Sequence, residues 1–389
     1  MRVAVILTAR PSYAKLKTVV AALVARQVDV QMICCASALL ERYGKVVDIV
    51  RQDFPQLAVT ECYSTYEGAN LITSAKETGA LLTELCAVLA RFRPDAVLIC
   101  ADRHEVLAVA QAATYLHLPL VHLQGGERSG SIDDRIRDSI TQLADWHCVS
   151  TEKAKYRVYA LTGDWDRIVN TGCPSIDLAK QALSDPPVTL EELGGSGPRL
   201  DLASPFVIVL QHSVTDEAEQ AGAQMLATLE AVGEISLPRI IFWPGEDAGQ
   251  EAVAKAIRVW KDQRPDLAIH TVRNLPPARF LKLLTQCACL VGNSSVGIRE
   301  GSYLGVPVVN IGTRQAGRER GPNVIESSHD EGCIIPSIEQ QIAYGPYPSS
   351  PLYGRGDAGE RIAEVLCGLA NIVAPDRDRD RAISRPTEA

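Results

Sequence analysis

Residues 3–8 read VAVILT, and the helix-like segment Tyr13–Arg26 follows them. An uninterrupted apolar run predicts a strand that is buried on both faces, as in parallel sheets. In the second segment Leu16, Val19 and Leu23 recur at helical spacing, so one face of the helix would pack against that strand. A buried strand followed by such a helix is the repeating unit of α/β folds.

The same alternation continues along the chain. In the first half the further strand-like runs are Val30–Cys35, Ala96–Cys100, Leu120–Leu123 and Trp146–Val149. The helix-like segments there are Leu71–Arg91 and the stretches near 104–116 and 135–144. In the second half the strand-like runs are Phe206–Leu210, Ile240–Trp243, Leu267–Thr271, Cys289–Val291 and Val306–Ile311. Helix-like segments accompany them at Glu217–Val232, Gln250–Trp260 and Ala278–Gln286. We therefore expect two α/β domains of similar size.

The alternation lapses between Ser184 and Pro205, where the sequence contains four prolines and three glycines. Such a composition is typical of a linker. We therefore expect an N-terminal domain at 1–185 and a C-terminal domain at 205–357. The helix-like segment 358–372 is expected to rejoin the N-terminal domain, and the charged residues 373–389 are expected to be disordered.

Composition excludes several classes of protein. Of the 389 residues, 46% are hydrophobic and 22% are charged, which is typical of a globular protein. We find neither an apolar run long enough to span a membrane nor the apolar core of a signal peptide. The net charge of −8 disfavours a general nucleic-acid binder. The eleven cysteines include no CxxC pair, so we expect reduced, buried thiols in a cytoplasmic protein and no structural zinc site.

Open α/β sheets bind ligands beyond the carboxyl ends of their strands, so with two such domains the expected site is the cleft between them. Arg10 follows the first strand and precedes a helix, where it could hold a phosphate or be a solvated loop arginine. Asp102 and Arg103 follow the strand Ala96–Cys100. They could serve function, or Asp102 could simply cap the next helix.

Residues 122–137 read HLQGGERSGSIDDRIR and follow another strand. The glycines allow a close backbone approach to a ligand. Ser131 and Asp134 have the spacing of a capping box with Asp in place of Glu or Gln, so both aspartates could merely open a helix. Asp133 lies one residue from that position and could face the cleft instead. The residues alone leave these alternatives open.

In the second half, His212 follows one strand and Arg314 follows another. The most telling stretch is GNSSVGIRE at 292–300, where a strand runs into a helix through Ser294 and Ser295. Their N–H groups and hydroxyls could cradle an anion, although a simple serine cap is the alternative. Glu300 lies about one and a half turns further on, where a carboxylate could bind ribose hydroxyls.

The expected site thus combines cationic side chains and helix N-termini with carboxylates. This combination suits the binding of a nucleotide diphosphate-sugar. The GxGxxG and P-loop patterns are absent from the sequence. With these residues assembled, the chain resembles the hydrolysing UDP-N-acetylglucosamine 2-epimerases of sialic acid biosynthesis from Arg2 to about Ile325. The motifs that carry the resemblance are TARPSYAKL, ADRHEVLA, HLQGGERSGSIDDRIR, GCPSID, QHSVTDE, GNSSVGIRE and NIGTRQAGRERGPNVI.

The resemblance implies a GT-B fold, with two Rossmann-like domains around a central cleft. It implies a UDP-sugar substrate, no metal or redox cofactor, and a homodimer or homotetramer. UDP would be held by Arg10, Arg103, His212, Ser294, Ser295, Glu300 and Arg314. The residues expected around the sugar and in catalysis are Asp102, Asp133, Asp134, Gln124 and His212. The implied reaction expels UDP from C1 as a proton leaves C2, then adds water and releases N-acetylmannosamine.

The sequence departs from the family pattern near the expected sugar site. Gln124 stands where sialic-type members have a glutamate considered catalytic, and a glutamine cannot exchange a proton. Ala101 replaces a usual glycine, Ser213 a usual proline and Asp138 a usual histidine. Three alternatives therefore stay open: an enzyme acting on a modified sugar nucleotide, a UDP-sugar-binding protein without epimerase activity, and a glycosyltransferase that uses the same cleft.

Overall fold

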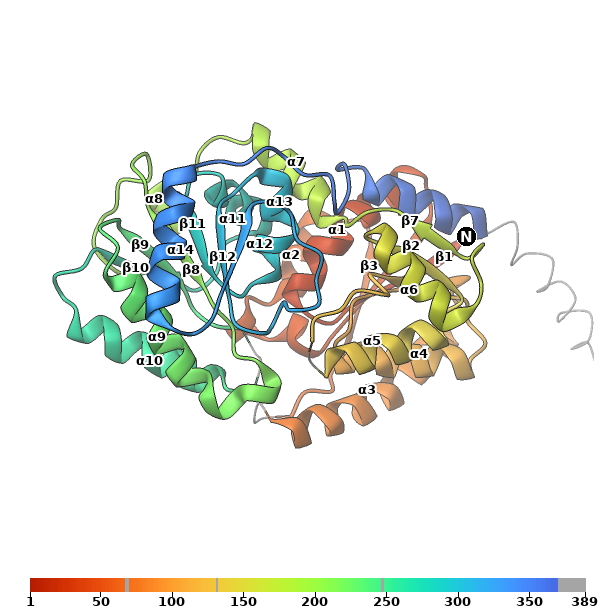
Figure 1. Ribbon diagram of the computed structural model, residues 1–389. Helices are drawn as coiled ribbons and strands as arrows, with labels where there is room; N and C mark the ends of the chain where they lie inside the picture. The colour runs from red at the N-terminus through yellow and green to blue at the C-terminus, as the bar shows by residue number, and fades with distance from the viewer. Residues whose placement is uncertain (67–69, 131, 246–247, 370–389) are drawn as a thin grey trace, which may run out of the picture.

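The computed structural model describes residues 1–66, 70–130, 132–245 and 248–369 and contains two α/β domains side by side (Figure 1). The first sheet has the strand order β3-β2-β1-β4-β5-β6-β7, and the second has the order β10-β9-β8-β11-β12-β13. Neighbouring strands within each sheet are parallel. The expected α/β class and GT-B fold are confirmed.

The strands of the first sheet are β1 (Arg2–Leu7), β2 (Asp29–Cys35), β3 (Ala58–Cys62), β4 (Ala96–Cys100), β5 (Leu120–Leu123), β6 (Trp146–Val149) and β7 (Ile168–Asn170). Those of the second are β8 (Val207–Leu210), β9 (Arg239–Phe242), β10 (Ile269–Val272), β11 (Cys289–Gly292), β12 (Val308–Ile311) and β13 (Val324–Ser327). The sequence did not indicate β3, β7 or β13. Each is an edge strand with partly exposed residues, so none presents a continuous apolar run.

The helices of the first domain are α1 (Arg10–Ala25), α2 (Val46–Asp53), α3 (Leu71–Phe92), α4 (His104–Tyr115), α5 (Asp133–Leu143) and α6 (Glu152–Thr162). At the junction lie α7 (Ser175–Ser184) and α8 (Leu190–Leu193). The second domain contains α9 (Ala221–Gly233), α10 (Gln250–Gln263), α11 (Pro277–Leu284), α12 (Ser295–Ile298), α13 (Glu300–Leu304) and α14 (Glu331–Tyr344). Short 3-10 turns occur at Ala36–Leu39, Glu41–Tyr43 and Thr215–Gln220.

Side chains of the central strands alternate between two cores, one on each face of a sheet. Val3 and Val5 of β1 pack with α1, whereas Ala4 and Ile6 pack with α3 and α4 on the other face. Val207 and Ile208 of β8 divide in the same way between the two cores of the second domain. Both sheets are thus buried on both faces.

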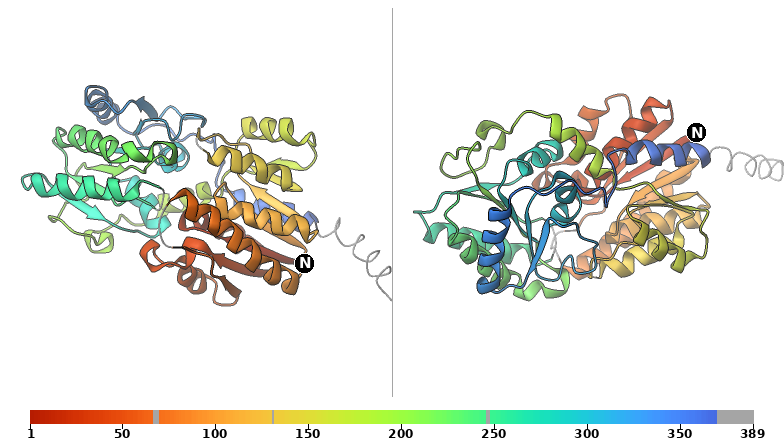
Figure 2. Two further views of the ribbon diagram at one scale, coloured as in Figure 1. Left: turned by 90° about the horizontal axis from the view of Figure 1, so that it is seen from below. Right: turned by 45° about the horizontal axis from the view of Figure 1, so that its top comes forward.

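The end of the chain returns to the first domain, as Figure 2 shows for the helix at 358–369. Ile362, Leu366 and Leu369 pack in the same core as β1 and α1. Asp177 at the start of α7 accepts the backbone N–H groups of Ala358 at 2.9 Å and Gly359 at 2.7 Å, so it holds the start of that helix. Residues 370–372 of the expected helix and the expected disordered tail 373–389 lie outside the described residues.

The segment expected to be a linker packs closely on the second domain. Leu193, Leu200 and Leu202 belong to a core of that domain, and Ser196 forms an antiparallel bridge with Thr271 at the edge strand β10. The segment therefore extends the second domain instead of hanging free. Its prolines and glycines suit the tight turns of this path.

All eleven cysteines lie in the described part of the chain and carry free thiols. Eight of them are buried, which supports the expectation that they serve packing, whereas Cys333 is exposed. Within the same described part, no helix is both long enough and apolar enough to cross a membrane.

Candidate active site

A cleft of about 500 Å³ lies where strand ends of both sheets meet. Six of the residues singled out from the sequence line it: Asp102, Arg103, Gln124, Asp133, Ser295 and Arg314. Five others belong to the described residues but not to this lining: Arg10, Asp134, His212, Ser294 and Glu300. The cleft thus joins residues more than 200 positions apart, from Asp102 to Arg314.

Two strand ends reach the cleft through strained backbone. Ala101, after β4, has φ +72°, and Gln124, after β5, has φ +66°. These left-handed conformations are uncommon for residues other than glycine, and they are typical of sites where the surrounding structure imposes the geometry. His122, buried beneath them, lies 2.9 Å through Nε2 from the backbone oxygen of Ala101. That contact ties the two strand ends together.

Asp102 is held by Arg137, a buried arginine of α5. The Arg137 guanidinium forms an ion pair with Asp102, donates to Asp134 at 2.6 Å and donates to the backbone oxygen of Glu127 at 2.5 Å. The alternative that Asp102 is the cap of the next helix is wrong, since α4 begins at His104 with Arg103 as its N-cap, and Asp102 pairs with Arg137 instead. Asp102 is therefore a carboxylate placed in the cleft by a partner cation.

The two adjacent aspartates of α5 lie in different surroundings. Asp134 accepts hydrogen bonds from the N–H groups of Ser129 at 2.7 Å and Gly130 at 2.9 Å, and from the Ser129 hydroxyl at 3.0 Å. With Arg137 as a further donor, its oxygens hold the loop before α5. Asp133 lines the cleft and is half-buried. The expected capping box involves Ser131, which lies outside the described residues.

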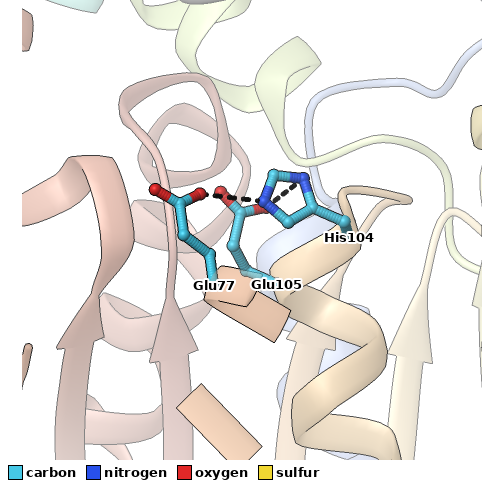
Figure 3. Close-up of side chains that lie close together, drawn as sticks. All are labelled: Glu77, His104 and Glu105. Carbon is cyan, nitrogen blue, oxygen red and sulfur yellow. Dashed lines mark hydrogen bonds and ion pairs between the residues drawn. The ribbon is translucent and has the colours of Figure 1, made fainter. Parts of the chain in front are cut away.

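Arg103 belongs to a cluster of charges that Figure 3 shows in part. Its guanidinium lies 3.2 Å from the buried carboxylate of Glu105. His104 Nε2 lies 3.2 Å from Glu77, and His104 Nδ1 lies 3.5 Å from Glu105. Because its partner Glu105 is fixed in the interior, Arg103 is held at the cleft wall.

Glu77, His104 and Glu105 offer ligand atoms within 4.8 Å of one another, close enough to hold a metal ion. Glu105 is, however, already engaged by the positive guanidinium of Arg103. A cation bound there would face that charge at short range, so the donor set fits an ion-pair network better than a metal site.

A second network crosses between the domains at Glu127. This carboxylate of the first domain accepts from Arg299 at 2.5 Å and also pairs with Arg318, both of the second domain. Burial opposes ionisation of Glu127, but the attraction of Arg299 and Arg318, with a contribution from Lys15, outweighs it and holds the pKa of Glu127 at about 2. Lys15 of α1 also lines the cleft, and burial lowers its pKa. Lys15, Arg137, Arg299, Arg318 and Glu127 therefore form a charged floor of the cleft.

Sequence reasoning did not single out these floor residues. Arg137, Arg299 and Lys15 lie within or between helices rather than directly after strands, so the strand-end criterion passed over them. One feature of the sequence could have indicated Arg137. It lies four residues after Asp133 and three after Asp134, a spacing at which side chains of a helix are neighbours.

The serine stretch of the second domain forms a cap as well as a possible cradle. Ser294 is the N-cap of α12 and accepts the Val296 N–H at 3.4 Å. The helix expected after these serines is short: α12 ends at Ile298, and Glu300 begins a separate helix, α13, with Arg299 between them. The break turns Arg299 inward to Glu127.

Glu300 is buried at the start of α13, and its Oε2 has no hydrogen-bond partner among the described residues. A buried carboxylate oxygen normally has a donor, so a hydroxyl of a bound ligand would satisfy it. Arg314 lines the cleft and donates to the backbone oxygen of Asn293 at 3.4 Å. Arg10 begins α1 and donates to the backbone oxygen of Leu275, in the second domain, at 2.6 Å. Burial lowers the pKa of Arg10.

Gln124 is buried among thiols. Its Nε2 lies 2.9 Å from the Sγ of Cys173, and the Cys100 thiol approaches its Oε1 at 4.0 Å. Cys173 in turn lies 2.9 Å from the hydroxyl of Ser175. These neighbours fix the side chain of Gln124, which still lines the cleft.

Comparison with known proteins identifies the family of the chain. The family model described as UDP-N-acetylglucosamine 2-epimerase matches residues 21–367. The chain belongs to this family. Among similar epimerases, a UDP-N,N'-diacetylbacillosamine 2-epimerase (hydrolyzing) from Legionella pneumophila is 29% identical, with 87% of this chain and 88% of the relative covered. A UDP-N-acetylglucosamine 2-epimerase from Neisseria meningitidis is 28% identical, with 94% of each chain covered.

A solved epimerase structure also resembles the whole chain. The Methanocaldococcus jannaschii UDP-GlcNAc 2-epimerase, in complex with UDP-GlcNAc and UDP, has a TM-score of 0.78 at 17% identity, covering 94% of this chain and 99% of that one. At this identity the likeness supports the fold.

Proposed function

We propose that this epimerase is of the hydrolysing type and converts UDP-N-acetylglucosamine and water into N-acetylmannosamine and UDP. The observation that carries the proposal is the composition of the cleft. It combines cations from both domains, suited to a diphosphate, with the carboxylates Asp102 and Asp133, suited to proton transfer. Family membership supports epimerisation at C2, and the hydrolysing relative from Legionella supports the addition of water.

The diphosphate would lie on the second-domain side of the cleft. Ser294 is the N-cap of α12 and Ser295 its first residue, and Arg314 and Arg103 line the same space from two domains. Glu300 would accept ribose hydroxyls through the carboxylate oxygen that now has no partner among the described residues. His212, Arg10 and these residues form the proposed UDP-binding set.

The proposed elimination of UDP explains why several cationic side chains line the cleft. The proton on C2 of the sugar is not acidified by an adjacent carbonyl, so departure of the diphosphate must run ahead of proton removal. In the first step the C1–O bond to UDP breaks, the C2 proton passes to a carboxylate, and a C1–C2 double bond forms. Charge that develops on the departing UDP is the main demand on the protein, and preorganised cations meet it.

In the second step water adds its oxygen to C1 and loses a proton to solvent, while a protonated carboxyl group delivers a proton to C2 from the opposite face, which gives the free epimeric sugar. We assign the proton transfers to Asp133 and Asp102, and the ion pair with Arg137 positions Asp102 in the cleft. We assign Asp134 to the support of the loop before α5, since its oxygens already accept bonds from that loop.

Gln124 favours a second candidate, an epimerase of the same type acting on a modified sugar nucleotide. Its amide can hydrogen-bond a substituent of the sugar but cannot exchange a proton. The Legionella relative is named for a diacetylated sugar, which fits a site altered near the sugar. A nucleotide-sugar binder without turnover and a glycosyltransferase are the remaining alternatives.

A panel of sugar nucleotides tests these candidates. Each is incubated with the protein, and the release of UDP and of free sugar is measured by chromatography. We expect UDP and a free C2-epimeric sugar in equal amounts from UDP-N-acetylglucosamine, or from a diacetylated analogue if the second candidate holds. If UDP binds but no sugar nucleotide of the panel is converted, the protein is a nucleotide-sugar binder without epimerase activity. A product that forms only with an added acceptor would indicate a glycosyltransferase.

A further inference from the structure

A second cavity, of about 180 Å³, lies between the domains beside the cleft. Glu127 and Arg318 line both spaces, so this ion pair forms part of the wall between them. The first domain contributes Lys153 and Arg157 of α6, and the second contributes Arg318 and Glu319. The volume is roughly a third of the cleft, too small for a second nucleotide-sugar.

Positive charge is in excess in this second cavity. Arg128, Lys153, Arg157 and Arg318 line it, against two carboxylates. Glu127 is paired with Arg299 and Arg318, whereas Glu319 accepts a hydrogen bond from the neutral hydroxyl of Thr151 at 2.5 Å. Because the four cations outnumber the two carboxylates, the cavity attracts anions.

Two arginine nitrogens of the lining are buried and have no hydrogen-bond partner among the described residues. They are Nε of Arg318, whose side chain is only 8% exposed, and Nη1 of Arg157. Arg157 reaches Asp138 through its other terminal nitrogen at 2.7 Å, so Nη1 remains available. Buried N–H groups are nearly always bonded, so both nitrogens call for an oxygen acceptor.

The same cavity receives the first turn of α6, an 11-residue helix with Thr151 as its N-cap. The partial positive charge of a helix start adds to the attraction of the arginines. Lys153 and Arg128 are exposed, so they mark the side on which an anion can enter from solvent.

We propose that this second cavity is a binding site for a small oxyanion of the size of phosphate. Arg157 and Arg318 donate hydrogen bonds to the anion from the two domains, and Lys153 and Arg128 lie at the entrance of the cavity. Because the donors come from both domains, the bound anion strengthens the contact between them. Binding of the anion also affects the cleft, because Arg318 lines both spaces and pairs with Glu127.

The test titrates inorganic phosphate into the protein by calorimetry and by thermal melting, at constant ionic strength with chloride as the balancing ion. Saturating UDP is present, so that the proposed nucleotide site is occupied. The variants are Lys153→Glu and Arg157→Gln, and Lys155→Ala on the same helix is the matched control, since its ammonium lies over the ring of Trp165 instead.

We expect saturable binding of one phosphate at millimolar concentration, with a rise in melting temperature that persists with UDP. Affinity should fall about tenfold in Lys153→Glu and Arg157→Gln, as for loss of one charge-assisted bond, and stay unchanged in Lys155→Ala. Absence of a saturable response, or equal responses of wild type and both variants, would overturn the proposal. A separate titration with UDP alone reports on the proposed function, so failure there is distinguishable from failure here.

Discussion

The side-chain amide of Asn293 holds the backbone of His212 at both of its polar atoms. Oδ1 accepts the His212 N–H at 2.8 Å, and Nδ2 donates to the His212 carbonyl oxygen at 2.8 Å. Asn293 follows β11 and His212 follows β8, and the two strands are neighbours in the sheet. The pair therefore fixes the spacing of the loops that carry His212 and Ser294.

Asn293→Ala should weaken UDP binding about tenfold, because both bonds to His212 are lost and the two loops separate. The measurement is a calorimetric titration with UDP. Asn310→Ala is the matched control: Asn310 is also a buried asparagine, within the neighbouring strand β12, and it donates to Glu326 at 3.0 Å instead. Equal UDP affinity in Asn293→Ala and wild type would show that the pair does not position the proposed UDP site.

Asp133→Asn and Asp134→Asn should fail in different ways. Asp133→Asn should reduce kcat by at least about 100-fold and leave the melting temperature near that of the wild type, because it removes a proposed proton carrier that faces the cleft. Asp134→Asn should cost about 2 kcal/mol of stability, since it weakens two hydrogen bonds from the loop before α5 and removes the ion pair with Arg137. Turnover assays and denaturant unfolding distinguish the two, and a reversal of the pattern would exchange the assigned roles.

Gln124→Glu tests whether the glutamine has replaced a proton-carrying group. A carboxylate at 124 would lie near the Cys173 sulfur and line the cleft beside Asp102. If the native glutamine tunes the site to a modified sugar, the variant should gain activity on UDP-N-acetylglucosamine and lose it on the diacetylated analogue. The ratio of kcat/KM for the two substrates is the measurement. A gain on both would indicate that the glutamine only lowers activity.

Acid should destabilise the protein first through its buried histidines. Burial lowers the pKa of His122 to about 4 and that of His147 to about 3. The unfolded chain then binds more protons, so stability is present above an unfolded pKa of about 6.5 and is lost as the pH falls toward 4. For His122 the difference corresponds to about 3 kcal/mol at neutral pH.

The check on this pH dependence is the free energy of unfolding, measured between pH 7 and 4. His122→Gln should flatten the fall in stability over this interval, whatever its effect at neutral pH. His117→Asn, a change at an exposed histidine, should leave the slope as it is. A wild-type slope in His122→Gln would contradict a neutral, buried His122.

Much of the fold could be predicted because its central strands are buried on both faces. β4, β5 and β6 have the predicted bounds, since each is a short, mainly apolar run whose residues are almost all buried. β3, β7 and β13 could not be found this way, because an edge strand exposes part of its surface. The break between α12 and α13 also escaped prediction, since it depends on Arg299 reaching a carboxylate of the other domain.

The search for residues at strand ends predicted six of the residues that line the cleft. It did not predict the charged residues of the cleft floor. Glu127, Arg299 and Arg318 meet only when the two domains come together, and their sequence separation hides that contact. The sequence could not distinguish Asp133 from Asp134, because they are adjacent and have the same side chain. Only the structure shows that Asp134 accepts hydrogen bonds from the loop before α5, whereas Asp133 lines the cleft.

The central claim, hydrolysis with epimerisation at C2, is tested most directly by proton NMR of the reaction with UDP-N-acetylglucosamine in heavy water. The account predicts UDP and N-acetylmannosamine that carries deuterium at C2, because the proton lost in elimination is replaced from solvent on the opposite face. Release of UDP with an unlabelled, unepimerised sugar would contradict it.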